Sequence, residues 1–305
     1  MTIPAGGYAW WYADAFSDDG RYGISLIAFI GSVFSPYYAW ARRGGPADPR
    51  EHCALNIALY GPGVGRWTMT ERGGRLVSVG PERLVIGPSA LSWDGTTLTV
   101  TVDEIGMPLP VPRRVRGVVR ITPRAITDHR VLLNADGRHR WWPIAPLAEV
   151  TVDLDRPALR WSGPGYLDMN QGDAPLAEGF RDWHWSRGPL RDGAAVLYGG
   201  TRRDGSRFDL GWRFGPDGQS TPLALPPPAH LRRSGWLIPR ETRSEPGRPA
   251  ALIRTLEDTP FYARSLVRMG LEGESVTAMH ESLALDRFVS PVVQAMLPFR
   301  MPRRG

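Results

Sequence analysis

Trp161-Ser-Gly-Pro-Gly-Tyr-Leu-Asp168-Met-Asn-Gln-Gly-Asp173 joins a turn signal to an aromatic residue and an acid. The Gly163-Pro164-Gly165 segment predicts a turn, because Gly and Pro readily adopt the backbone angles that turns require. The chain is then expected to run extended through Tyr166 and Asp168. Residues two apart on a strand point to the same face, so these two side chains are predicted to lie on one face of a sheet.

A second pair with the same spacing, His139-Arg-Trp141, lies upstream and follows an Asn134-Ala-Asp-Gly137 turn signal. If the two segments are neighbours in a sheet, one wall carries a carboxyl group, a phenol, an imidazole and an indole. Such a wall can deliver a proton to an apolar molecule and stabilise the resulting cation. The alternative is structural: an acid that caps a turn beside two core aromatic residues.

Asp-Gly dipeptides recur along the chain and predict hairpins, because Gly accepts the positive φ of tight hairpin turns. They are Asp19-Gly20, Asp94-Gly95, Asp136-Gly137, Asp192-Gly193, Asp204-Gly205 and Asp217-Gly218. Most are flanked by runs rich in β-branched or aromatic residues, such as Leu98–Val102. Turn signals at this density predict an all-β fold of antiparallel strands, either a sandwich or a barrel.

Other strands, a loop and a helix are expected outside the Asp-Gly hairpins. Gly6–Phe16 predicts an aromatic strand, and Gly61–Gly65 predicts a hairpin loop rather than a nucleotide loop, because no helix follows it. Further strands are expected at Arg181–Trp185, through Trp236 and Ile253, at Tyr262–Met269 and at Val276–Leu285. Phe288–Leu297 predicts a short C-terminal helix that Pro298 ends. A boundary near Asp173–Ala177 divides the chain into predicted domains at 1–175 and 176–305.

Composition excludes several kinds of chemistry. All 37 basic side chains are Arg, so a lysine Schiff base, lysine-bound pyridoxal phosphate and a phosphate-binding P-loop are impossible. The single cysteine, Cys53, lies in an apolar run that is typical of a core, and it leaves no intrachain disulfide. The six His residues lack the close spacing of a zinc site, so we expect no metal.

No secretory signal or membrane span is predicted, because the longest apolar run, Ile24–Phe34, is far shorter than the roughly 20 residues of a span. We therefore expect a cytoplasmic protein. The net charge of +6 favours an anionic partner. Nucleic acid is not expected, because the Arg residues are spread along the chain. The tail Leu297–Arg304 mixes apolar and basic residues, which suits either an acidic membrane surface or a solvated terminus.

Longer motifs carry a family resemblance. They are Tyr8–Asp14, Gly31–Trp40, Gly165–Asp168, Asp258–Tyr262 and His280–Arg287. These motifs resemble those of the bacterial carotenoid 1,2-hydratases, also called hydroxyneurosporene synthases, along residues 6–304. The resemblance implies two tandem lipocalin-like β-barrels, to which the residue pattern adds the short C-terminal helix. It also implies addition of water across the terminal 1,2 double bond of acyclic carotenoids such as neurosporene and lycopene.

The resemblance implies no organic cofactor and no redox change. The expected partners are an acyclic carotenoid, water and an anionic membrane surface. Such a substrate dissolves in a lipid bilayer, so we expect the protein to associate peripherally with the inner (intracytoplasmic) membrane.

Hydration of an unactivated alkene requires a neutral acid, and burial raises the pKa of Asp above its usual value of about 3.9. Asp168 is the predicted acid. Tyr166 and Trp141 would stabilise the cation, with about 0.5–2 kcal/mol from each aromatic face. His139 would either orient the water and take its proton or hydrogen-bond Asp168. Substrate-binding side chains are expected at Tyr8, Trp11, Trp183 and Trp185.

Alternatives remain for both the site and the function. The segment Asp182-Trp-His184-Trp185 places a second acid and imidazole on one face, and Asp14 in the aromatic first strand is a third candidate acid. Lipocalin-like barrels also occur as carriers of apolar ligands, which need no acid. A cofactor-free pericyclase or isomerase would act on a polyene without adding water.

Overall fold

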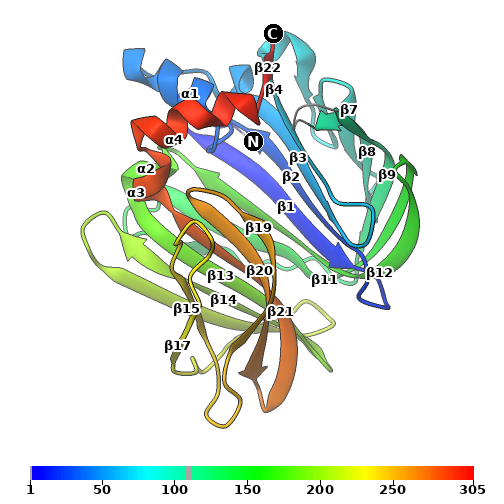
Figure 1. Cartoon of the computed structure of the whole chain (residues 1–305), viewed down its shortest axis with the longest axis vertical. Helices are drawn as coiled ribbons and strands as arrows, with labels where there is room; N and C mark the ends of the chain where they lie inside the picture. The colour runs from blue at the N-terminus through cyan, green and yellow to red at the C-terminus, as the bar shows by residue number, and fades with distance from the viewer. Residues whose placement is uncertain (1, 107–111) are drawn as a thin grey trace. The chain divides into compact units, whose positions relative to one another are not determined.

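The protein folds into antiparallel sheets, which confirms the all-β prediction. The computed structural model describes residues 2–106 and 112–305. They form two compact units, the first made of residues up to Pro175 together with Ala295–Gly305, and the second of Leu176–Gln294 (Figure 1). The expected division after residue 175 falls at the same point, although two separate domains remain a prediction. Residues 295–305, which the sequence predicts to be part of the second domain, group with the first unit, where β22 pairs with β4.

The first unit holds one large sheet with the strand order β22-β4-β3-β2-β1-β12-β11-β9-β8-β7-β6-β5, and β10 pairs with β11. Its strands are β1 (Tyr8–Phe16), β2 (Gly23–Ile30), β3 (Cys53–Tyr60), β4 (Arg66–Arg72), β5 (Val77–Val79), β6 (Arg83–Ile86), β7 (Ser89–Trp93), β8 (Leu98–Gly106), β9 (Arg113–Pro123), β10 (Val131–Leu132), β11 (His139–Arg156), β12 (Ala158–Gly172) and β22 (Arg303–Arg304). All neighbours are antiparallel except β22, which runs parallel to β4.

This sheet curls until β4 lies against β8, although the two strands are not hydrogen-bonded neighbours. The approach is close: a Cβ atom on Gly106 of β8 would lie 2.2 Å from the carbonyl oxygen of Trp67 on β4. The enclosed core is aliphatic and includes Leu55, Ile57 and Val100. Strand pairing in the described residues runs as an open path from β22 to β5, so a closed lipocalin-like barrel stays an expectation while the curled antiparallel sheet is observed.

The Asp-Gly dipeptides lie where the sequence predicts hairpins. Each falls between strands that pair with each other: β1 and β2, β7 and β8, and β10 and β11 in the first unit, and β13 through β16 in the second. Their glycines, which are Gly20, Gly95, Gly137, Gly193, Gly205 and Gly218, all have positive φ. The hairpin loop predicted at Gly61–Gly65 is confirmed between β3 and β4.

The turn predicted at Gly163-Pro164-Gly165 is wrong, because these residues lie inside the continuous strand β12. Their small size serves close packing instead. A Cβ atom on Gly163 would lie 2.1 Å from the carbonyl oxygen of Phe16, and one on Gly165 would lie 2.4 Å from Cγ2 of Val150. Glycine therefore lets β12 pass close to its neighbours rather than reverse the chain.

Short helices connect the strands of the first unit. They are α1 (Pro36–Ala41), η1 (Arg42–Gly44), η2 (Pro49–Glu51), η3 (Gly74–Leu76) and η4 (Leu297–Phe299). Helix α1 begins at Ser35, whose hydroxyl accepts a hydrogen bond from the Tyr38 amide at 2.9 Å, and Pro36 occupies the first turn, where its missing N–H costs nothing.

The second unit holds a sheet with the order β16-β15-β14-β13-β21-β20-β19 and a separate β17-β18 pair. Its elements are α2 (Leu176–Gly179), β13 (Phe180–Leu190), β14 (Gly193–Arg202), β15 (Arg207–Phe214), β16 (Ser220–Pro222), β17 (Pro228–Leu231), β18 (Arg240–Arg243), β19 (Ala251–Asp258), β20 (Tyr262–Leu271), β21 (Glu274–Ala284) and α3 (Leu285–Phe288). Helix α4 (Pro291–Met296) begins in the second unit and its last two residues belong to the first. The predicted C-terminal helix is confirmed as α4. The strand predicted through Trp236 is wrong, because this residue lies in the loop between β17 and β18.

Candidate active site

One face of β1, β12 and β11 gathers the predicted catalytic residues. In the observed register, Asp168 lies opposite Tyr12, Tyr166 lies opposite Asp14, and Trp141 lies opposite Asn170. Directly opposed residues of antiparallel strands share a face. The expectation that His139-Arg-Trp141 and the Tyr166–Asp168 segment are neighbours is therefore confirmed by the pairing of β11 with β12.

Asp168 is held by two hydrogen-bond donors. The indole Nε1 of Trp141 donates to Oδ2 of Asp168 at 2.9 Å, and the hydroxyl of Tyr166 donates to the same oxygen at 3.0 Å. All three side chains are buried, with Asp168 only 4% exposed. Because both donors occupy Oδ2, a proton on this carboxyl group would be carried by Oδ1.

His139 forms a second buried pair with Tyr8. Its Nδ1 lies 2.9 Å from the Tyr8 hydroxyl, and the two rings stack with centroids 5.8 Å apart. Burial lowers the pKa of His139 to about 4 and raises that of Tyr8 well above its usual value, so both side chains are neutral near pH 7. Gly172 makes room for the pair, since a Cβ atom there would lie 2.3 Å from the Tyr8 ring and 2.8 Å from Nδ1 of His139.

The low pKa of His139 predicts that acid destabilises the fold. Between pH 6.5 and pH 4 an unfolded chain protonates this imidazole and the folded chain does not, so stability is lost as the pH falls through this window. Since one pKa unit corresponds to about 1.4 kcal/mol, His139 alone accounts for about 3 kcal/mol. Denaturant unfolding at pH 7.5 and 4.5 should show that His139→Gln loses less stability on acidification than the unmodified protein. An equal loss in both proteins would remove His139 as the cause.

The same face carries aromatic and polar residues that the sequence prediction missed. Trp10 lies opposite Asn170 and stacks on Tyr8 with centroids 5.0 Å apart, while Tyr12 packs edge-on against Tyr166 at 6.2 Å. The signal was present in the sequence, because the β1 face that carries Tyr8, Trp10 and Tyr12 alternates with a face that is alanine except for Trp11. Trp11, which was expected to bind substrate, lies on the opposite face beside the aliphatic core, so it is not part of the wall around Asp168.

Asp14 shares the face of Asp168. It is 1% exposed and lies opposite Tyr166, two positions along β12 from Asp168. Its other neighbour in the sheet is Ser25 on β2. By position, Asp14 is therefore the closest rival to Asp168 as a proton donor.

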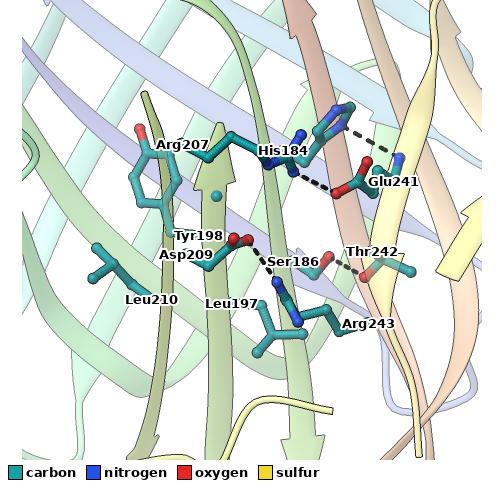
Figure 2. Close-up of a pocket in the computed structure, with 11 residues that line it drawn as sticks. His184, Ser186, Leu197, Tyr198, Arg207, Asp209, Leu210, Glu241, Thr242 and Arg243 are labelled. Carbon is teal, nitrogen blue, oxygen red and sulfur yellow. Dashed lines mark hydrogen bonds and ion pairs between the residues drawn. The ribbon is translucent and has the colours of Figure 1, made fainter. Parts of the chain in front are cut away.

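The rival pair Asp182 and His184 lies in the second unit. The carboxylate of Asp182 accepts a hydrogen bond from the Thr201 amide at 3.2 Å, and Nδ1 of His184 lies 3.0 Å from the Ser282 hydroxyl. Next to His184 is a small pocket crossed by two ion pairs, Arg207–Glu241 at 2.6 Å and Arg243–Asp209 at 3.0 Å (Figure 2). Its volume of about 20 Å³ suits a single water, and its charged lining does not suit a hydrocarbon.

Trp183 and Trp185, also expected to bind substrate, alternate with His184 on β13 and so lie on the other face of that strand. Both are buried. Trp183 packs edge-on against Tyr198 with centroids 5.7 Å apart and also contacts Phe180. Their role in binding substrate stays a prediction.

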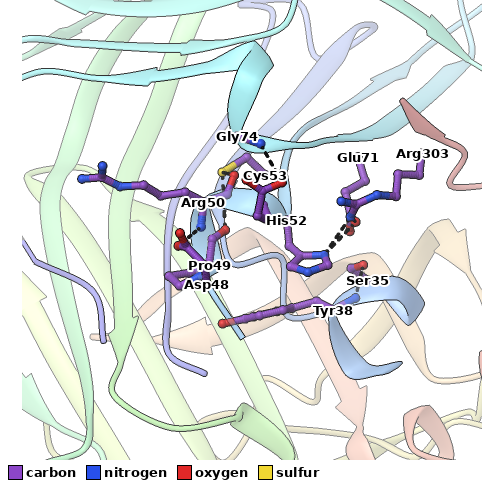
Figure 3. Close-up of polar contacts among 11 residues, drawn as sticks. Ser35, Tyr38, Asp48, Pro49, Arg50, His52, Cys53, Glu71, Gly74 and Arg303 are labelled. Atoms are coloured by element: carbon purple, nitrogen blue, oxygen red, sulfur yellow. Dashed lines mark hydrogen bonds and ion pairs between the residues drawn. The ribbon is translucent and has the colours of Figure 1, made fainter. Parts of the chain in front are cut away.

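The C-terminal tail is fixed to the first unit through a buried polar cluster (Figure 3). Arg303 contacts the carboxylate of Glu71 and lies 2.9 Å from Nδ1 of His52. The Tyr38 ring stacks on the His52 ring with centroids 4.6 Å apart. Cys53 lies beside this cluster and is fully buried, which agrees with the expected core position.

The tail Leu297–Arg304, whose charges are Arg300, Arg303 and Arg304, is one of the expected membrane contacts. Arg303 is engaged by Glu71, and Arg300 lies over the Trp67 ring at 4.6 Å. Met301 is only 4% exposed and is not available for insertion, whereas Phe299 is 80% exposed. Within the described residues, no helix is long and apolar enough to cross a membrane, and no group of His, Cys, Asp or Glu is arranged to hold a metal ion.

A family model described as "Carotenoid hydratase CrtC" matches residues 26–305. The chain belongs to this family. The acyclic carotenoid 1,2-hydratase of Thiocapsa roseopersicina is 55% identical over 100% of this chain and 75% of the relative. That of Cereibacter sphaeroides is 46% identical over 92% of this chain and 98% of the relative.

Solved structures agree on the fold. Kievitone hydratase from Nectria haematococca superposes with a TM-score of 0.53 at 8% identity, covering 92% of this chain and 90% of that chain. At this identity the likeness concerns the fold alone. The family match and the carotenoid hydratase relatives confirm the family resemblance seen in the sequence. This member of the carotenoid hydratase family is therefore a hydratase, an enzyme that acts on carotenoids.

Proposed function

We propose that the enzyme adds water across the terminal 1,2 double bond of acyclic carotenoids such as neurosporene and lycopene, with Asp168 as the acid. The observation that carries the proposal is the buried Asp168 carboxyl group, whose Oδ2 is held by Trp141 and Tyr166. The names of the relatives support the substrate class.

The first step transfers the proton on Oδ1 of Asp168 to the less substituted carbon of the double bond. The π electrons form the new C–H bond, and the positive charge is left on the tertiary carbon. Trp141 and Tyr166 stabilise that charge through their ring faces and hold the carboxylate that remains. Tyr12 and Trp10 extend the same aromatic wall.

In the second step, water attacks the tertiary cation and loses a proton. With a pKa of about 4, His139 is a weak base, so its proposed role is to orient the water through its neutral imidazole. The proton from the water returns to the Asp168 carboxylate, which restores the acid. In the net reaction, one alkene and one water give one tertiary alcohol, without a redox change or a cofactor.

A carotenoid is a hydrocarbon that dissolves in a bilayer, so we propose that the enzyme works at the surface of the inner membrane. The net charge of +6 supports attraction to anionic lipid, worth about 1 kcal/mol for each basic residue near the surface. The proposal does not rely on the C-terminal arginines, since Arg303 is paired with Glu71.

Incubation with lycopene in ¹⁸O-labelled water tests the proposed reaction. Mass spectrometry should show a product that has gained one labelled water at each hydrated end. Recovery of unchanged lycopene in a stable complex would favour the carrier. A product of unchanged mass but altered retention would favour the isomerase.

A further inference from the structure

The loop Arg232–Pro239 between β17 and β18, which we call the Trp236 loop, holds two large apolar side chains in solvent. Trp236 is 47% exposed and Leu237 is 60% exposed, whereas Ser234 and Ile238, which bracket the tip Gly235–Leu237, are 4% and 1% exposed. These two buried residues anchor the tip to the second unit. Adjacent exposed apolar residues at a tip are unlike the scattered single residues that are ordinary on protein surfaces.

The tip is held in an unfavourable backbone conformation. Leu237 has φ of +61°, in the left-handed region that non-glycine residues rarely adopt. The surrounding hydrogen bonds enforce it: the Leu237 amide donates to the Ser234 carbonyl at 2.9 Å, and the Ile238 amide donates to the Ser234 hydroxyl at 3.1 Å.

Two charged side chains on neighbouring elements form hydrogen bonds with the backbone of the loop. Arg287, in α3, donates to the carbonyl oxygens of Trp236 and Leu237. Asp258, at the end of β19, accepts hydrogen bonds from the amides of Gly235 and Trp236. These contacts fix the backbone of the loop, so Trp236 and Leu237 are held at its tip.

We propose that the Trp236 loop is the element that inserts into an anionic bilayer surface. The tip supplies an indole and a leucine, the pair of groups suited to the interface between head groups and acyl chains. Exposed Arg232 and Arg233 precede the tip and Arg287 contacts it, against the one carboxylate of Asp258 that accepts from its amides. The balance of charge beside the tip is therefore positive and complements anionic head groups. The inference rests on the proposed function in one respect: a bilayer is where the hydrocarbon substrate dissolves.

Vesicle co-sedimentation tests the loop with a variant that should fold. In Trp236→Ser/Leu237→Gly both apolar groups are lost, and glycine accepts the positive φ at position 237, so thermal unfolding should occur at or above the temperature of the unmodified protein. Affinity for phosphatidylcholine vesicles containing about one third phosphatidylglycerol should fall by about tenfold or more. Trp40→Ser is the matched control, because Trp40 is 69% exposed on the first unit and should be dispensable.

The charge contribution is tested separately. Arg232→Ser/Arg233→Ser should weaken binding to the phosphatidylglycerol vesicles and leave weak binding to pure phosphatidylcholine unchanged. The proposal is overturned if the unmodified protein does not bind vesicles, if the Trp236/Leu237 variant binds as well as the unmodified protein, or if Trp40→Ser removes binding instead.

Turnover separates this inference from the proposed function. Hydration of lycopene dispersed in detergent should be the same in the Trp236/Leu237 variant and the unmodified protein, whereas hydration of lycopene in vesicles should fall with binding. If the unmodified protein hydrates neither form, the proposed function fails while the binding result stands on its own.

Discussion

Asp168→Asn is expected to lower the rate of carotenoid hydration by about 10²–10⁴-fold, the usual contribution of a general acid. The amide has the shape of the carboxyl group, and its oxygen can still accept from Trp141 and Tyr166, so the fold should persist. It cannot donate a proton of comparable acidity to an alkene. Turnover of lycopene by purified variants, with circular dichroism and thermal unfolding as checks of folding, measures the effect.

Two matched variants sharpen this test. Asp14→Asn changes a buried acid on the same face, and Asp182→Asn changes the rival acid in the second unit. If Asp168 is the donor, both should retain far more activity than Asp168→Asn. If a folded Asp168→Asn variant turns over lycopene nearly as fast as the unmodified protein, Asp168 is not the donor. The donor would then be Asp14 or Asp182, whichever one abolishes activity when it is changed to Asn.

Local backbone chemistry made much of the fold predictable. Each Asp-Gly dipeptide specifies a positive φ at its glycine, and this requirement holds whatever the rest of the chain does. That His139 shares a face with Trp141, and Tyr166 with Asp168, also followed from local features, because side chains alternate along each strand. That the two strands are neighbours did not follow from them.

Features set by distant contacts were not predictable. The Gly163-Pro164-Gly165 segment has the composition of a turn, yet its glycines are needed because Phe16 and Val150 approach them across the sheet. Arg303 looked like a free basic tail residue because its partner, Glu71, is 232 positions away in the chain. Alternation along β1 alone separates Trp11 from Tyr8, because residues three apart on a strand face opposite sides. The register between β1 and β12, which places Trp10 and Tyr12 beside Asp168, is specified by no short stretch of sequence.

Glu104→Leu is expected to destabilise the first unit by about 3–5 kcal/mol. Glu104 on β8 and Arg72 on β4 form an ion pair at 2.8 Å, with side chains 0% and 5% exposed. The pair joins strands that are not hydrogen-bonded neighbours, at the place where the sheet curls onto itself. Burial raises the pKa of Glu104 despite the opposing charge of Arg72. Leucine would leave the Arg72 guanidinium buried without a counter-charge, and a guanidinium does not lose its proton in proteins.

The double variant Arg72→Met/Glu104→Leu separates the cost of an unpaired charge from the value of the pair. Replacing both partners with apolar residues removes the buried charge together with its counter-charge, and such replacements are often neutral or stabilising. We therefore expect the double variant to unfold at a denaturant concentration close to that of the unmodified protein, well above that of Glu104→Leu. A double variant as unstable as the single one would mean that the loss of the hydrogen bonds from Arg72 to the Thr70 carbonyl and from Ser89 to Glu104, rather than an unpaired charge, causes the instability.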